Sequence, residues 1–203
     1  ITLNNNLSTA NNGHIGLYSD NAIAGLTSQR NVTAAGTFTY APLSTTFASA
    51  VSYPITNLNV SSTGLTIGKS TNTANITVAG TTSINGPIMI YGDDLTVNAA
   101  LTTTNNGTGD ITLIGTKLLG ANPITLATGR TLTANLSGTS EFTGDISGTT
   151  ISLTKSGAGT LTLNPTNALV FQNANVTAGG LTIAASKQLT VSGTLTNDGT
   201  LTL

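Results

Sequence analysis

A two-residue alternation between aliphatic residues and threonine dominates this sequence. In an extended strand, alternate side chains point to opposite faces, so the Leu, Ile and Val residues take one face and Thr takes the other. Thr is β-branched and suits a pleated strand while it remains polar. The alternation therefore predicts an almost entirely β chain of short strands. The aliphatic-Thr-aliphatic triplets lie at residues 1–3, 65–67, 76–78, 95–97, 111–113, 124–126, 161–163, 181–183, 189–191 and 201–203.

The triplets recur at a nearly regular interval. Thr162, Thr182 and Thr202 are 20 positions apart, and other triplets fall between such positions. Pairs such as Asn85-Gly86 supply the tight turns between strands. A repeat of this length with several short strands is typical of a parallel β-solenoid, in which each coil pairs with the next. For 203 residues it predicts one solenoid segment, 1–203, of about ten coils of about 20 residues.

An antiparallel β-sandwich is the alternative fold, because it also has short strands at a spacing of about 8–12 residues. The composition favours the solenoid. Only 4% of the residues are aromatic and 6% are charged, whereas a sandwich of this size buries more rings and exposes more charge. In stacked coils, aliphatic ladders fill the interior and ladders of Thr, Asn and Ser cover the outside, so few rings or charges are needed.

Residues 14–60 fit the repeat least well. Four of the chain's eight aromatic residues lie within a stretch of sixteen positions of this segment, close to Pro42 and Pro54. They are Phe38, Tyr40, Phe47 and Tyr53. Because proline cannot occupy a central strand, residues 36–57 are expected to leave the coils as a loop or hairpin. The rings either plug the solenoid or pack the loop against its flank, which is the interpretation we favour, or they form a protruding contact surface.

The low charge excludes several classes of protein. With 6 Lys+Arg and 7 Asp+Glu, the chain lacks the cations that a nucleic-acid binder uses on phosphates. No apolar run reaches the about 20 residues that a membrane-spanning helix needs. Cysteine is absent, as suits a chain that is exported unfolded. The sequence begins without a targeting signal and ends within the repeat, so we expect a fragment of a longer chain.

One run carries a family resemblance. Lys155-Ser156-Gly157-Ala158-Gly159-Thr160-Leu161-Thr162-Leu163 resembles the β-strand repeat of autotransporter passengers. The segment 13–19 and the coils around Ile76 and Leu95 resemble filamentous-haemagglutinin-like exoproteins. The resemblance implies a right-handed β-helical shaft, secreted and displayed on the bacterial cell surface as a structural or adhesive stalk. Its partners would be neighbouring coils, further copies of the chain, or surface glycans and proteins. Neither a secretion domain nor a translocator barrel is found in the sequence.

Catalysis and metal binding are not expected. Polysaccharide-cleaving β-helical enzymes need two positioned carboxylates, and the one adjacent pair is Asp93-Asp94. His14 precedes this pair by about eighty residues, the reverse of the order in pectin hydrolases, so we interpret both aspartates as turn formers. One His without Cys cannot build a zinc site. We therefore predict no catalytic, cofactor or metal residue. The aspartates predicted to cap turns are Asp20, Asp110, Asp145 and Asp198.

Two repeated motifs leave alternatives open. Seven Asn-X-Ser/Thr sequons occur, as many as the composition predicts by chance, so they do not indicate glycosylation. They begin at Asn6, Asn31, Asn59, Asn75, Asn106, Asn135 and Asn175. Thr-X-Thr arrays on a flat solenoid are an ice-binding pattern, although their spacing here is irregular. They lie at residues 131–133, 160–162, 194–196 and 200–202. Ice binding, a polysaccharide-degrading enzyme and a self-assembling fibre subunit are the alternatives to the shaft.

Overall fold

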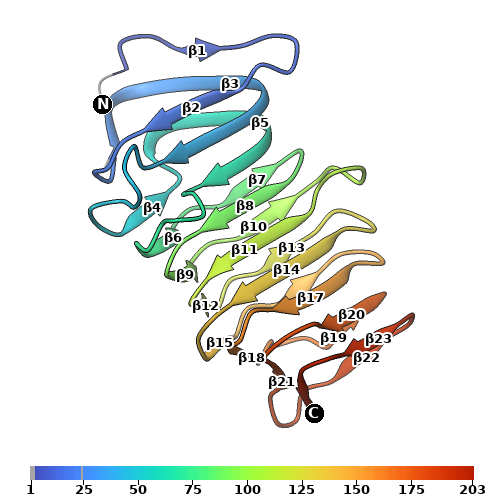
Figure 1. The fold of residues 1–203 in the computed structure, drawn as a ribbon. Coiled ribbons are helices and arrows are strands. Elements are labelled where there is room, and N and C mark those ends of the chain that lie inside the picture. The colour runs from blue at the N-terminus through green and yellow to red at the C-terminus, as the bar shows by residue number, and fades with distance from the viewer. Residues whose placement is uncertain (1–2, 24) are drawn as a thin grey trace.

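The chain forms a right-handed parallel β-solenoid (Figure 1), which confirms the predicted fold class. The computed structural model describes residues 3–23 and 25–203, so the first triplet lies partly outside the described residues. The solenoid has about nine turns of about 21 residues, close to the expected ten of about 20. Every pairing among the described strands is parallel, which rules out the antiparallel sandwich.

Three faces surround the core, and from β7 onward the strands visit them in a fixed order. The first face is one sheet along the whole rod. It contains β2 (Ile15–Tyr18), the later parts of β3 (Gly25–Ala41) and β5 (Thr56–Ile67), β8 (Ile88–Tyr91), β11 (Ile111–Gly115), β14 (Thr131–Leu136), β17 (Ser152–Ser156), β20 (Asn173–Val176) and β23 (Leu195–Asn197). β3 and β5 curve around a corner, so their earlier parts belong to the third face, where β1 (Leu7–Ser8) pairs with β3.

The other two faces are each built from two shorter ladders. The second face contains β4 (Val51–Tyr53), β6 (Ile76–Val78), β9 (Asp94–Val97) and β12 (Lys117–Gly120), then β15 (Ser140–Phe142), β18 (Thr160–Leu163), β21 (Gly180–Ile183) and β24 (Thr200–Thr202). The third face contains β7 (Thr82–Ile84), β10 (Leu101–Thr103), β13 (Ile124–Thr125) and β16 (Ile146–Ser147), then β19 (Leu169–Phe171) and β22 (Leu189–Val191). The described residues contain no helix that is long and apolar enough to cross a membrane.

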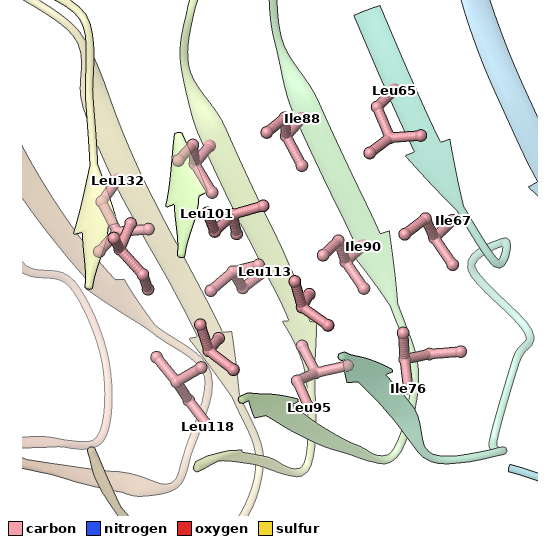
Figure 2. Packing of buried hydrophobic residues seen from close by; sticks show 14 of the residues in the cluster. Leu65, Ile67, Ile76, Ile88, Ile90, Leu95, Leu101, Leu113, Leu118 and Leu132 are labelled. Atoms are coloured by element: carbon pink, nitrogen blue, oxygen red, sulfur yellow. The ribbon is translucent and has the colours of Figure 1, made fainter. Parts of the chain in front are cut away.

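The core is made of aliphatic ladders, one rung from each coil. On the first face Ile111, Leu132 and Leu153 are in register at intervals of 21 residues, and all three are fully buried. Figure 2 shows the Leu and Ile side chains of neighbouring coils packed side by side between the faces. The alternating residues Thr112 and Thr133 pair in the same register on the outside. Burying each such Leu or Ile contributes about 1.5–3 kcal/mol relative to leaving it exposed.

The N-terminal coils are longer than the rest, and this longer repeat accommodates the aromatic residues. Phe38 pairs with Leu65, 27 positions later, whereas from Ile111 onward the first face repeats every 21 residues. A longer coil encloses a wider interior, which the rings fill. Phe38, Tyr40, Phe47 and Tyr53 are all buried, and the Tyr40 and Phe47 ring centroids lie 5.1 Å apart. The rings therefore pack inside the solenoid and do not form a protruding surface.

The structure divides the segment 36–57, for which a loop or hairpin outside the coils is expected. Residues 36–41 continue β3 between its parallel neighbours, and Val51–Tyr53 pair in parallel with β6. Only the connections 42–50 and 54–55 contain no strand. Pro42 and Pro54 each directly follow a strand, so the prolines end strands without removing the segment from the coils.

Lys155 is the one charged residue, among those described, whose side chain is fully buried. In β17 it occupies an inward position, in register with Ala134 and Val176 of the adjacent coils. Its Nζ donates hydrogen bonds to the carbonyl oxygens of Ser156 at 2.6 Å and Gly157 at 3.0 Å. The lysine therefore satisfies main-chain acceptors at the corner between β17 and β18. Burial lowers the pKa of this ammonium group below its ordinary value of 10.5.

Lys155 is expected to make the stability of the protein rise with alkaline pH. The unfolded chain keeps the Lys155 proton up to about pH 10.5, but the folded chain releases it earlier. In that window the unfolded state binds more protons, so the free energy of unfolding increases with pH. Urea unfolding midpoints between pH 8 and pH 10 measure this slope. Lys155→Met should flatten the slope, and the exposed-site control Lys117→Met should keep it. Equal slopes in both variants would contradict the assigned role.

Candidate functional site

Aspartates at the coil corners bind the following coil. Each accepts a hydrogen bond at Oδ1 from a main-chain N–H one coil later: Asp20 from Ser44 at 2.6 Å, Asp110 from Thr131 at 2.8 Å and Asp145 from Asn167 at 2.9 Å. The predicted capping role is thus correct in kind, but the donor belongs to the next coil instead of the local turn. Asp198 lies in the last coil and makes no such bond among the described residues.

Asparagines make the same contact, in the same direction along the chain. Asn6 accepts from Asn31 at 2.9 Å, Asn75 from Asp94 at 3.1 Å and Asn106 from Thr128 at 3.1 Å. Asn173 accepts from Thr194 at 2.9 Å. Three of these asparagines begin sequons. Their side-chain oxygens therefore already accept hydrogen bonds from a neighbouring coil. We call these seven Asp and Asn side chains the corner acceptors. Sequence reasoning missed this role, because these seven residues do not recur at one coil length and their partners are known only from the stacking.

The remaining sequon asparagines lie on the outside of the rod. Asn59 Nδ2 donates to Asn31 Oδ1 at 3.2 Å, which again joins adjacent coils. Asn135 is exposed in β14 and Asn175 is half-buried in β20. Both therefore belong to the polar outer surface of the first face.

The residues considered for catalysis lie in different coils. His14 Nδ1 accepts the main-chain N–H of Thr37 at 2.8 Å. Asp94 begins β9, where its carboxylate lies 3.6 Å from Lys117 Nζ, in the next coil. The main-chain oxygen of Asp93 accepts a hydrogen bond from Thr116. Two coils, those of β3 and β5, separate His14 from the aspartates, so the structure does not bring them together. Within the described ranges, no three His, Cys, Asp or Glu residues cluster as a metal site.

The Thr-X-Thr arrays are divided between two faces. Residues 131–133 and 194–196 lie on the first face, whereas 160–162 and 200–202 lie on the second. From Ile111 to Leu195 the first face keeps a constant 21-residue register, which is more regular than the sequence spacing suggests. Ser152, Asn173 and Asn175 interrupt the threonines of this face. The outer surface is therefore a mixed array of neutral polar side chains.

A groove opens on the third face where its ladder is interrupted. β7 pairs only with β10, and the part of β5 beside β7 pairs only with β3. Two adjoining hollows of about 250 Å³ and about 400 Å³ share Pro54, Leu58 and Asn59. We call this continuous depression the seam groove. Its walls are residues 52–60, in the 27-residue coil between Phe38 and Leu65, and residues 79–84, in the next coil. The seam groove combines a concave shape with a strand edge, that of β7, which has no ladder partner on the side of β5.

Comparison of the chain with protein-family models, with curated proteins and with solved structures finds no match in any of the three. Its function is therefore inferred from its own fold and contacts.

Asp145 tests the contribution of the corner acceptors. The main-chain N–H of Asn167 holds the pKa of Asp145 below its ordinary value, so this bond stabilises the fold above about pH 4 and is lost as the pH falls. Asp145→Ala should lower the free energy of unfolding at pH 7 by up to about 1 kcal/mol and weaken its decline between pH 5 and pH 3. Asp145→Asn keeps an acceptor oxygen and should stay near the wild-type stability at pH 7. Urea unfolding across this range measures both; identical wild-type and Ala profiles would refute the role.

Proposed function

We propose that this chain is a non-catalytic structural and adhesive shaft of a secreted bacterial surface protein. The observation that carries the proposal is the uninterrupted sheet of the first face, which joins the coils from β1 to β23. Main-chain hydrogen bonds connect each coil to its neighbours, and the corner acceptors add side-chain bonds between coils. At about 4.8 Å per coil, the about nine turns extend for roughly 43 Å. Such a stack suits a stiff spacer.

The chemistry of the surface supports an adhesive role outside the cell. The outer rungs are mostly neutral Thr, Ser and Asn, and the formal net charge is −1. A surface of this kind approaches another surface without strong electrostatic repulsion. The absence of cysteine suits export as an unfolded chain, and the run from Lys155 to Leu163 resembles the repeat of autotransporter passengers. These features support secretion and display on a bacterial surface.

A surface-display experiment tests this proposal. Antibody labelling of intact bacteria that express the protein should give extracellular signal, and beads coated with the purified protein should adhere to cell surfaces. No polysaccharide should be cleaved by the wild type or by Asp94→Asn. Labelling that needs permeabilised cells, or polysaccharide turnover that Asp94→Asn abolishes, would overturn the proposal.

A further inference from the structure

We propose that the seam groove binds a neutral oligosaccharide. This inference rests on the proposed adhesive function and names the class of ligand that one site on the shaft would take. The groove lies between β5 and β7 and has four relevant properties: open main-chain groups, a buried hydroxyl without a partner among the described residues, an aliphatic floor and an uncharged lining.

The first property is an open main-chain position on β7. Thr82 donates its N–H to Ala100, and Ile84 accepts from Thr104, so both residues direct their main chains toward β10. Because alternate residues of a strand face opposite neighbours, the N–H and C=O of Ser83 point to the other side, where the groove lies. The pairing that would satisfy them is missing, since β5 and β7 do not form a ladder. The Ser83 side chain is exposed.

The second property is the hydroxyl of Tyr53. Tyr53 is only 3% exposed and lines the groove, and its hydroxyl has no hydrogen-bond partner among the described residues. Among all the described residues, the fully enclosed side-chain N and O atoms without a hydrogen-bond partner are Arg130 Nε and Ser140 Oγ. The Tyr53 hydroxyl is not one of them, and Tyr53 is one of the residues that line the hollow. Tyr40, by contrast, accepts the N–H of Ile23 at 2.8 Å. The Tyr53 hydroxyl is therefore a buried polar group available to a ligand.

The floor and the rim determine the chemistry of that ligand. Leu58, Ile84 and the ring of Pro54 provide aliphatic surface, and Thr56, Asn59 and Thr81 stand exposed at the rim. Every residue that lines the two hollows is uncharged. A charged ligand would lose hydration there without gaining an ion pair. A pyranose ring fits this combination, because its C–H face packs on aliphatic groups and its hydroxyls both donate and accept hydrogen bonds.

The spacing of the walls favours a saccharide over an extended peptide. A peptide that completed the ladder would need β5 and β7 about 9.6 Å apart, twice the about 4.8 Å between paired strands. Cα atoms of β5 and β7 approach within 8 Å, so a strand does not fit between them. On β7, moreover, only the main chain of Ser83 is open, which would give a peptide few bonds. A short saccharide can occupy the hollows without spanning both edges.

A glycan array tests the proposal on the purified full chain. The array carries neutral, sialylated and sulfated oligosaccharides, and we expect binding to a subset of the neutral ones only. Tyr53→Phe removes the hydroxyl but keeps the ring, so it should weaken binding roughly three- to tenfold without lowering Tm. Ser83→Tyr fills the groove from its exposed rim and should abolish binding.

Two matched variants separate the groove from the rest of the surface. Thr102→Tyr places the same bulk on β10, in register with Ser83 but outside the groove, and should leave binding unchanged. Tyr40→Phe removes a hydroxyl that bonds Ile23, and should lower Tm while the affinity stays the same. Equal effects of Ser83→Tyr and Thr102→Tyr would contradict the proposed location.

The remaining outcomes are distinguishable. Binding of sialylated or sulfated glycans, of none at all, or only of uncharged peptides with alternating Thr and Val, used as a parallel probe, would overturn the saccharide proposal. Because this assay uses purified protein, such a result leaves surface display and bead adhesion unaffected. Neutral-glycan binding that survives Ser83→Tyr would keep the adhesive function and reject the groove as its site.

Discussion

Parallel main-chain pairing between successive coils is the interaction on which the rest of this structure depends. It places each residue about 4.8 Å above its counterpart in the preceding coil, so every side-chain position becomes a ladder of similar residues. Like charges in one ladder would repel at that distance by about 1 kcal/mol even in water. Leu, Ile and Val stack inside and Thr, Ser and Asn outside without that cost. The 6% charged content is therefore a consequence of the stacking.

The few charges that occur follow the same constraint. Asp94 and Lys117 are direct partners in register, so opposite charges stack, with 3.6 Å between the carboxylate and Nζ. Lys155 has neutral Ala134 and Val176 above and below it, and its ammonium binds carbonyl oxygens at the corner. The corner acceptors also join successive coils, because each side-chain oxygen accepts a hydrogen bond from a main-chain N–H of the next coil. The charged and hydrogen-bonding side chains thus stabilise the stacking of the coils.

The proposed binding groove lies where the stacking is irregular. The early coils repeat at 27 residues between Phe38 and Leu65, and the next interval, to Ile88, is 23. β5 remains paired with β8 on the first face, but on the third face it does not pair with β7. This change of coil length leaves the main chain of Ser83 without a ladder partner on the side of the groove, and among the described residues the Tyr53 hydroxyl has no hydrogen-bond partner. A uniform coil would have closed the same ladder and offered only a flat polar surface.

The sequence by itself determined the β class, the inward and outward alternation and the approximate coil length, because each follows from local periodicity. It also indicated that the aromatic residues are buried, but not that residues 36–41 and Val51–Tyr53 remain in the parallel sheets. Only the tertiary structure decided the three faces, the partners of the corner acceptors and the seam groove. Asp20 and Ser44, or Tyr53 and Ser83, are far apart along the chain, and their proximity depends on the length of each coil. Coil length is set by packing and pairing over the whole stack, which no local pattern encodes.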